Sequence, residues 1–235
     1  MEIQNYFKRY EIKYLLSPEQ YEKMREIAKI ATVPDEYGKS TVCNIYYDTP
    51  DSRIIRRSLE GPEYKEKLRL RSYGVATNET GVFLELKKKY LGVVYKRREA
   101  MTYARAVDFL RNPEPYSQIT RETEYFMRFY ENLMPAMFIS YSREAFYGKE
   151  NRDFRITFDR DILWRDYDTD LRAGVYGKRV ISPDTVLMEI KTGGAMPMEI
   201  AHALSQNGIY KTSFSKYGRA YIQKTATVET EVIYA

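Results

Sequence analysis

The chain has 235 residues, of which 30% are charged, with a formal net charge of +5 and a single cysteine, Cys43. A lone cysteine excludes an internal disulfide and is typical of a reducing compartment, and the modest positive excess fits an anionic partner without requiring nucleic acid. No apolar run approaches the roughly 18 residues of a membrane-spanning helix, and residues 1–5 lack the pattern of a secretory leader, so we expect a cytoplasmic protein without a transmembrane segment.

The N-terminal part of the chain predicts strands and helices in alternation. Charged and apolar residues alternate before Ser17, which places Glu11 and Lys13 on one face of a strand. Ser17 followed by Pro18 is typical of a helix start, with serine as the N-cap and proline in the first turn. The predicted elements are a strand over 7–16, a helix over 18–31, a strand over 40–48 and a short helix over 52–59.

Residues 63–98 then repeat one pattern three times. Lys65, Lys67, Arg69 and Arg71 occupy alternate positions with leucines between them. A period of two places the cations on one face of a strand and the leucines on the other. The pattern predicts antiparallel strands over 63–74, 82–90 and 93–99, with Phe83, Glu85, Lys87 and Lys89 on the charged face of the second, a tight turn at Leu91-Gly92, and Lys96 and Arg98 on the charged face of the third.

The remainder of the chain predicts three more strands and four helices. The strands, over 137–147, 153–159 and 185–191, carry Arg143, Arg155 and Glu189 opposite apolar faces, and the polar connection over 160–183 has no long predicted element. The helices are predicted over 104–111, 119–133, 197–206 and 214–224. In the second of them the stripe of Tyr125, Phe126, Phe129 and Leu133 indicates packing rather than a cofactor site.

Cations that face one another across neighbouring strands, about 5 Å apart, destabilise a sheet. One interpretation is a solvated outer face on which water and salt screen the repulsion. The other is a cavity that holds a polyanion. Arg69 and Arg71 favour the cavity because guanidinium groups suit phosphate oxygens, and Glu85 and Glu189 among the cations suit a divalent metal that bridges phosphates.

Eight predicted strands are enough to close a barrel with a usable interior. In an ordinary small barrel the apolar side points inward, but here the predicted helices can cover an apolar outside and leave the charged side within. We therefore predict an α+β fold, an eight-stranded antiparallel β-barrel with flanking helices. No linker, repeat or low-complexity tract interrupts the sequence, so we predict one domain over residues 1–235.

Two common kinds of site are not indicated. The sequence has no glycine-rich loop of the G-x-x-x-x-G-K-[ST] kind, which argues against a nucleoside triphosphatase of that class. His202 is the only histidine and lies in a predicted helix, and a zinc site is not expected without a cluster of histidines or cysteines.

Eight short motifs follow one another along almost the whole chain. They are Tyr10-Glu-Ile-Lys-Tyr14, Ile45-Tyr-Tyr-Asp48, Leu68-Arg-Leu-Arg71, Leu84-Glu-Leu-Lys87, Tyr141-Ser-Arg143, Arg155-Ile-Thr-Phe-Asp159, Met188-Glu-Ile-Lys191 and Phe214-Ser-Lys-Tyr217. In this order they resemble the catalytic domain of the vacuolar transporter chaperone (VTC) polyphosphate polymerases, and more broadly the triphosphate tunnel metalloenzymes of the CYTH-like group. The chain looks like a free-standing version of that domain.

The resemblance implies a basic tunnel that binds ATP or another triphosphate, or inorganic polyphosphate, together with Mn²⁺ or Mg²⁺. It implies Glu189 as the metal ligand, supported by Glu11 and Glu85. The catalytic residues it implies are Lys13, Arg69, Arg71, Lys87, Arg143, Arg155 and Glu189. The phosphate ligands it implies are Lys13, Arg69, Arg71, Lys87, Lys96, Arg143, Arg155 and Lys216.

One position departs from the family's pattern. The polymerases carry a second lysine three residues before the one that matches Lys216, and here that position is Ser213, with Lys211 nearby but out of register. The departure weakens the expectation of chain elongation more than that of phosphate binding.

Phosphoryl transfer requires chiefly positioning and charge stabilisation, which fixed cations and a metal supply. The leading hypothesis is transfer of the terminal phosphate of ATP to a growing polyphosphate chain, with a separately encoded membrane protein as a candidate partner. The alternatives are a tripolyphosphatase or nucleoside triphosphatase, in which water is the acceptor, and a non-catalytic polyphosphate sensor. The last alternative is an RNA-binding β-protein, in which exposed tyrosines on basic strands would stack bases. We rank it lowest and expect no nucleic-acid partner, because the tyrosines fall mostly on the apolar faces.

Overall fold

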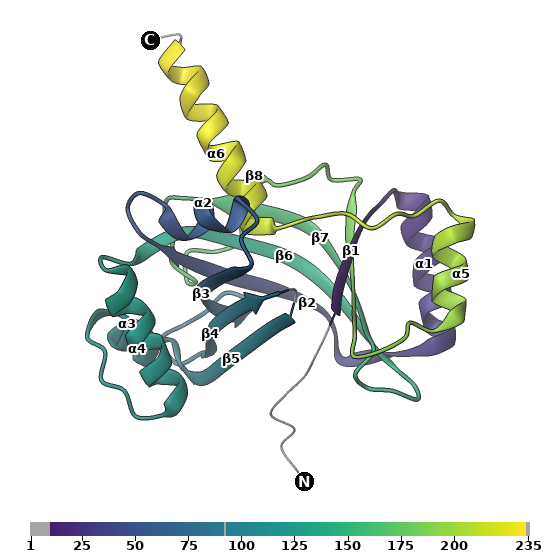
Figure 1. Ribbon diagram of the computed structural model, residues 1–235, viewed down its shortest axis with the longest axis horizontal. Helices are drawn as coiled ribbons and strands as arrows, with labels where there is room; N and C mark the ends of the chain where they lie inside the picture. Colours follow the sequence, from purple (N-terminus) through teal and green to yellow (C-terminus); the bar gives the residue numbers. More distant parts are fainter. Residues whose placement is uncertain (1–9, 92, 234–235) are drawn as a thin grey trace.

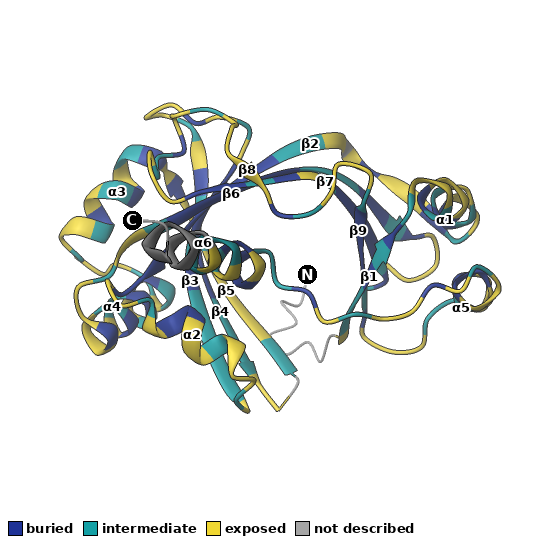
Figure 2. Cartoon of the chain, turned by 90° about the horizontal axis from the view of Figure 1, so that it is seen from above, coloured by how far each residue is buried: buried dark blue, intermediate teal, exposed yellow. Residues whose placement is uncertain are grey.

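One antiparallel sheet runs through the computed structural model, which describes residues 10–91 and 93–233 (Figure 1). Its strands arc around a common interior, with helices on the outside (Figure 2). Across the sheet the order is β1 (Tyr10–Leu16), β9 (Val186–Thr192), β7 (Arg155–Arg165), β6 (Met134–Gly148), β2 (Thr32–Asp48), β3 (Tyr64–Tyr73), β4 (Gly81–Tyr90) and β5 (Val93–Thr102). The two-residue strand β8 (Lys178–Arg179) pairs with β7 off this path.

The sheet is barrel-like, but backbone pairing does not close it within the described part of the chain. β1 and β5 end the strand order, and no ladder among these residues joins them. An ion pair bridges this seam instead, because Lys87 Nζ on β4 lies 2.8 Å from Glu11 Oε2 on β1. The predicted α+β fold with flanking helices and a barrel-like antiparallel sheet is thus confirmed. The expected closure is not made by backbone pairing between the described strands, and a side-chain ion pair joins the last side.

The described residues form six helices, and three buried apolar clusters hold them against the sheet. The helices are α1 (Pro18–Ala31), α2 (Arg53–Leu59), α3 (Tyr103–Arg111), α4 (Gln118–Tyr130), α5 (Met198–Gln206) and α6 (Lys216–Ile233). One cluster packs α3 and α4 on β3 to β5, the second packs α1 and α5 on β1, β7 and β9, and the third lies under α2 and α6. None of these helices is both long and apolar enough to span a bilayer.

The clusters explain which face of each strand points inward. Leu68 and Leu70 of β3 and Leu84 of β4 are fully buried against α3 and α4, and burying each leucine contributes about 1.5–3 kcal/mol. Because strand side chains alternate, the cations between these leucines must point to the other side, into the barrel. The predicted inward direction of the charged faces is confirmed.

The predicted start of α1 is confirmed in detail. Ser17 Oγ accepts a hydrogen bond from the backbone N–H of Gln20 at 3.2 Å, and Gln20 Oε1 accepts one from the N–H of Ser17 at 3.0 Å. This reciprocal pair is a capping box, and Pro18 occupies the first turn, where a missing N–H costs no helical hydrogen bond.

Several predicted boundaries were wrong. β2 begins at Thr32 rather than at residue 40, because residues 32–34 pair with the end of β6 despite Pro34 and an irregular register after it. β7 continues to Arg165, through residues predicted to be a connection, because its register with β6 shifts between Ser140 and Ser142 and the simple alternation is lost. α6 likewise extends beyond the predicted limit of residue 224. Residues 7–9 of the first predicted strand, and Gly92 of the predicted turn, lie outside the described residues.

The predicted apolar stripe of α4 is only partly a packing surface. Phe126 is buried in the cluster with α3, but Tyr125 and Phe129 are 70% and 56% exposed. Their rings stack on each other, with centroids 6.5 Å apart. Helical spacing alone could not separate the buried ring from the exposed ones, because all three fall within one broad face of the helix.

Asp48 links α2 and α6 to the sheet. Its carboxylate is fully buried and accepts hydrogen bonds from the N–H groups of Ile54 and Ile55 in the first turn of α2, at 2.9 and 3.0 Å. It also accepts one from the hydroxyl of Tyr217 on α6, at 2.8 Å. Ser52 precedes α2 in a left-handed conformation and makes no side-chain cap, so the carboxylate of Asp48 serves as the cap.

We expect Asp48→Ala to lower the free energy of unfolding by about 2–4 kcal/mol, because it leaves the N–H groups of Thr49, Ile54 and Ile55 and one hydroxyl without this acceptor. Tyr217→Phe removes one of these bonds and should cost about 1 kcal/mol. Urea unfolding followed by circular dichroism measures both values. Asp51→Ala is the matched control, since Asp51 forms an exposed pair with Arg56, and a loss as large as that of Asp48→Ala would contradict the capping role.

Candidate anion-binding site

The inward faces of the strands and the start of α6 bring nearly all the predicted site residues together. They come from β1, β3, β4, β5, β6, β9 and α6, segments that are far apart in the sequence. This geometry favours the cavity interpretation of the cationic strands over a solvated outer face. The predicted residues assembled here are Lys13, Arg69, Arg71, Lys87, Lys96, Arg143, Lys216, Glu11, Glu85 and Glu189.

Glu85 on β4 organises the cations of one wall. Its carboxylate is buried and contacts Arg69 Nε at 2.6 Å and Arg71 Nε at 3.8 Å, and it pairs with Lys96 of β5 on its other side. Burial by itself would raise the pKa of Glu85, but the three cations more than offset this effect and hold the pKa well below its usual range. Glu85 therefore stays ionised and keeps these cations aimed at the interior.

In a row of lysines beside Glu85, nearby carboxylates offset less of the positive charge. Lys67, Lys87 and Lys96 are direct cross-strand partners on β3, β4 and β5. Burial, together with the neighbouring Lys13 and Lys87, lowers the pKa of Lys67 to about 8. Burial and the nearby Arg69 lower the pKa of Lys96 to about 7, although Glu85 opposes the shift. A bound anion would relieve this repulsion, so the row is poised to accept negative charge.

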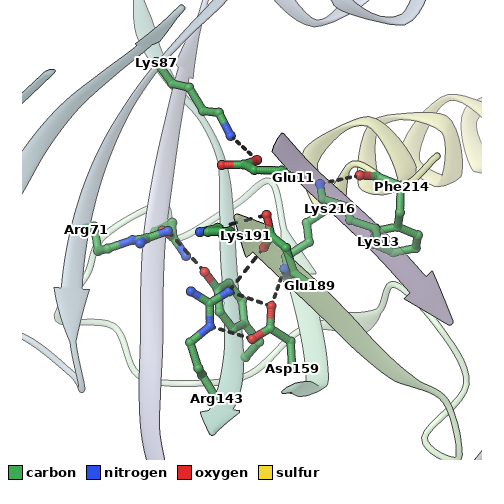
Figure 3. Close-up of polar contacts among 12 residues, drawn as sticks. Glu11, Lys13, Arg71, Lys87, Arg143, Asp159, Glu189, Lys191, Phe214 and Lys216 are labelled. Carbon is green, nitrogen blue, oxygen red and sulfur yellow. Dashed lines mark hydrogen bonds and ion pairs between the residues drawn. The ribbon is translucent and has the colours of Figure 1, made fainter. Parts of the chain in front are cut away.

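Glu189 on β9 is the centre of the opposite wall (Figure 3). Lys191 Nζ and Arg143 Nη2 lie 4.0 and 3.9 Å from its carboxylate oxygens, and Lys13 is its cross-strand partner on β1. Burial favours a high pKa for Glu189, but the cations around it, Lys191 first, hold the pKa well below its usual range. The carboxylate is thus negative even inside the barrel.

Asp159 on β7 holds two of these cations in place. Arg143 donates to both of its oxygens, at 2.6 and 2.7 Å, and Lys216 donates to one of them at 2.5 Å (Figure 3). The carboxylate of Asp159 is fully buried. Lys13 is fixed differently, because its ammonium donates to the backbone carbonyl of Phe214 at 2.7 Å. The start of α6 is thereby tied to β1, β6 and β7.

Glu189 and Glu11 are the carboxylates available for a metal. The cations nearest to Glu189 lie beyond hydrogen-bonding distance. Burial and the charge of Glu189 act to raise the pKa of Glu11, but Lys87 and Lys191 more than offset them and lower it, so Glu11 is also ionised. The described residues contain no group of three or more histidine, cysteine or acidic side chains in a metal-binding arrangement. Mg²⁺ is commonly held by one or two carboxylates together with phosphate oxygens and water, so this pair fits a metal that enters with a phosphate ligand.

Uncharged side chains orient Arg71 from both sides. Its Nε donates to Asn44 Oδ1 at 2.8 Å, and its Nη2 donates to the hydroxyl of Tyr141 at 3.1 Å. The ring of Tyr141 also lies 4.3 Å from the ammonium of Lys216. Burial favours a high pKa for the Tyr141 phenol, but Arg143, Arg71 and Lys216 lower the pKa to about 8. Two buried polar groups therefore fix the guanidinium plane.

Sequence patterns did not mark these orienting residues as part of the site. Asn44 and Tyr46 lie in phase on the predicted strand over 40–48, and the hydroxyl of Tyr46 accepts a hydrogen bond from Arg69 at 3.2 Å. Periodicity could have added Lys67, which is in phase with Arg69 and Arg71, and Lys191, which is in phase with Glu189. Asp159 is in phase with Arg155 on the predicted strand over 153–159, but its role depends on Arg143 and Lys216, which arrive from other elements and which no local pattern reveals.

Arg155 is directly opposite Lys191 on β9, next to the wall of Glu189, but its own ion pair lies outside both walls. It pairs with Asp35 of β2 at 3.1 Å, and its guanidinium lies over the ring of Tyr147, 4.6 Å from the centroid. On β7 it follows the inward face beyond Thr157, the cross-strand partner of Glu189. It therefore lies toward one end of the barrel interior.

Comparison with known proteins identifies relatives of this arrangement. The family model described as the VTC domain matches residues 8–223. Among solved structures, a candidate adenylate cyclase from Bacillus halodurans is 14% identical, with 88% of this chain and 95% of that chain covered and a TM-score of 0.55. A candidate adenylyl cyclase from Hippeastrum, which has a dominant triphosphatase activity, is 15% identical, with 90% and 94% covered and a TM-score of 0.53. A search of curated proteins found no match. At these identities the two structures support the fold alone.

We expect the binding of inorganic tripolyphosphate to take up protons above about pH 8. The anion favours the charged form of Lys67 and Lys96, so their pKa values rise on binding. As the pH is raised, the dissociation constant for tripolyphosphate should therefore increase by up to about tenfold per pH unit for each proton taken up. Isothermal titration calorimetry in two buffers with different ionisation enthalpies, at pH 7 to 9, measures the uptake.

The anion also titrates in this pH range, so protons taken up by the lysines must be distinguished from protons taken up by the anion. The double variant Lys67→Met, Lys96→Met makes this distinction. It should take up fewer protons per anion bound than the unchanged protein. Equal uptake by the two proteins would show that these lysines do not gain protons when the anion binds.

Proposed function

We propose that this chain, which belongs to the VTC domain family, is a metal-dependent phosphotransferase that acts on triphosphates and polyphosphate within its barrel. The finer activity we propose is the transfer of the terminal phosphate of ATP to an inorganic polyphosphate chain. The attacking group is a terminal oxygen of the chain. A bond forms from it to the γ-phosphorus, the bond from that phosphorus to the β–γ bridging oxygen breaks, and ADP leaves.

The observation that supports this proposal is the excess of inward cations over carboxylates. Other inward cations, among them Arg98 and Arg155, lie toward the ends of the barrel. Between them, nine cations are grouped with four carboxylates on the described strands and at the start of α6. The cations are Lys13, Lys67, Arg69, Arg71, Lys87, Lys96, Arg143, Lys191 and Lys216, and the carboxylates are Glu11, Glu85, Asp159 and Glu189. A triphosphate carries about the charge that would neutralise this excess, and guanidinium and ammonium groups suit its oxygens.

The two walls suggest separate tasks. Arg69, Arg71, Lys87 and Lys96 would bind the phosphates that are not transferred, because Glu85, Glu11, Asn44 and Tyr141 already fix most of their directions. Lys13, Arg143 and Lys216 surround Glu189, where the transferred phosphate would lie. Arg155 would bind phosphate toward one end of the interior. Stabilisation by positioned charge is the main protein contribution in phosphoryl transfer, and no protein nucleophile is needed.

The proposed cofactor is Mn²⁺ or Mg²⁺, held by Glu189 with Glu11 nearby. When bound, such an ion neutralises charge on the phosphate oxygens and orients them. Glu85 is a weaker candidate for this role, because Arg69, Arg71 and Lys96 occupy it. We further propose that the protein acts in the cytoplasm and passes its product to a separate membrane protein.

The main alternative is hydrolysis, in which water replaces the chain end as acceptor. Two observations favour it: Ser213 stands where the polymerases carry a second lysine, and the Hippeastrum protein of similar fold is a triphosphatase. Incubation with ATP and Mn²⁺ or Mg²⁺, followed by gel electrophoresis and a phosphate assay, separates the activities. We expect polymer that exopolyphosphatase degrades, whereas free phosphate without polymer would establish the hydrolase.

We expect Glu189→Gln to reduce turnover at least 100-fold, because the amide cannot replace a negatively charged metal ligand, while the dissociation constant for tripolyphosphate should change only a few-fold. Turnover assays and calorimetry measure the two effects. Glu122→Gln on the outer helix α4 is the control, since Glu122 faces Arg97 outside the site. Unaltered turnover in Glu189→Gln would refute the metal role, and binding without turnover in the unchanged protein would indicate a sensor.

A further inference from the structure

Three aromatic side chains follow the cations at one end of the barrel. On β3, Tyr73 comes two residues after Arg71 on the same inward face. On β4, Phe83 is the cross-strand partner of Arg71. Tyr147 lies near the end of β6, on the inward face that also carries Tyr141 and Arg143. We call Tyr73, Phe83 and Tyr147 the ring cluster.

Strand directions place Tyr73 beyond Arg71 and Tyr147 beyond Arg143 in the same direction. Tyr73 is opposite Val42 of β2 and Tyr147 is opposite Val33, farther toward that end. β3 and β6 both pair antiparallel with β2, so they run in the same direction, and Tyr73 and Tyr147 lie toward the ends of their strands. The ring of Tyr73 is edge-on to Phe83, with centroids 6.1 Å apart. Burial raises the pKa of Tyr147, and Tyr73 is close enough to add to that shift.

Packing does not account for the ring cluster. None of its members belongs to the three buried apolar clusters of the described residues. Tyr73 is 50% exposed, and Phe83 and Tyr147 are partly exposed. Aromatic rings left open to water at the end of a charged cavity are available to a ligand.

A guanidinium accompanies two of the three rings. Arg98 of β5 lies over Phe83, with its central carbon 4.5 Å from the ring centroid. Arg155 lies over Tyr147 at 4.6 Å and is itself held by Asp35. Exposed rings with neighbouring guanidinium planes are the groups on which proteins stack unpaired nucleobases.

The spacing from cations to rings suits a nucleotide. Two residues of strand separate Tyr73 from Arg71 by about 7 Å, a length comparable to the sugar that joins a base to its first phosphate. We infer that the ring cluster is a nucleobase-binding subsite, which stacks the base of a nucleoside triphosphate while its phosphates extend inward past Arg71 toward Glu189. This inference rests on the proposed function, because it takes a triphosphate as the ligand of the inner cations.

The subsite gives a nucleotide an advantage over an inorganic phosphate chain. Stacking uses the face of a base rather than its edge and tolerates different bases. The ring cluster therefore distinguishes nucleoside triphosphates from inorganic tripolyphosphate without strong selection between adenine and guanine. It also orients the donor, because the terminal phosphate is directed to the wall that carries Glu189.

Calorimetry with ATP and with inorganic tripolyphosphate tests the inference on the full chain. Tyr73→Ala and Phe83→Leu should each raise the dissociation constant for ATP by about tenfold, the loss expected when one base stack is removed. The constant for tripolyphosphate should stay within about twofold, since that ligand has no base. Tyr73→Phe keeps the ring and should retain the affinity for ATP. Thermal unfolding of each variant verifies that it is folded.

Tyr90→Ala is the matched control, because Tyr90 is on the same strand as Phe83 and is 49% exposed, but points to the outer side. It should leave both constants unchanged. Equal losses for ATP and tripolyphosphate in Tyr73→Ala, or no loss for ATP in either ring variant, would overturn the subsite and leave the proposed function standing. If the unchanged protein binds neither ligand, the proposed function fails, and the subsite fails with it.

Discussion

Repulsion among cations inside the barrel is the constraint on which the rest of the structure depends. Lys67, Lys87 and Lys96 face one another across three neighbouring strands, an arrangement that weakens a sheet. Two buried carboxylates offset part of it. Glu85 and Asp159 hold arginines and lysines by short ion pairs and remain ionised because those cations lower their pKa values. The positive charge that remains is not neutralised by the described residues that line the interior. A bound polyanion would neutralise it.

Burial of the apolar outer face of the sheet offsets the repulsion among the charges of the interior. Helices bury the leucines of β3 and β4 and the apolar faces of β1, β7 and β9, and this burial stabilises strands whose other faces repel one another. The start of α6 joins the two parts. Lys216 reaches Asp159 in the interior, while the next residue, Tyr217, donates to buried Asp48 and stacks on Tyr46. The site and the fold therefore share the same segment of chain.

Sequence reasoning was most successful where a period of two was long and uninterrupted. The alternation of Leu68 and Leu70 with Arg69 and Arg71 predicted both the strand and the direction of each side chain. It was least successful where the register shifts, as in β7, or where a strand contains Pro34 and Gly38, as in β2. A bulge moves the side chains that follow it to the other face, so a local pattern cannot be carried across it.

The sequence alone determined that basic and apolar residues would lie on opposite sides of the strands, because strand geometry makes side chains alternate whatever the fold. It also supported a phosphate-binding family through the order of its motifs. Only the tertiary structure decided which charges meet. Asp159 with Lys216, Glu11 with Lys87, and Asn44 with Arg71 are pairs formed between segments remote in sequence. Their energies depend on distance and burial, which the curvature of the sheet sets and which no local stretch of residues encodes.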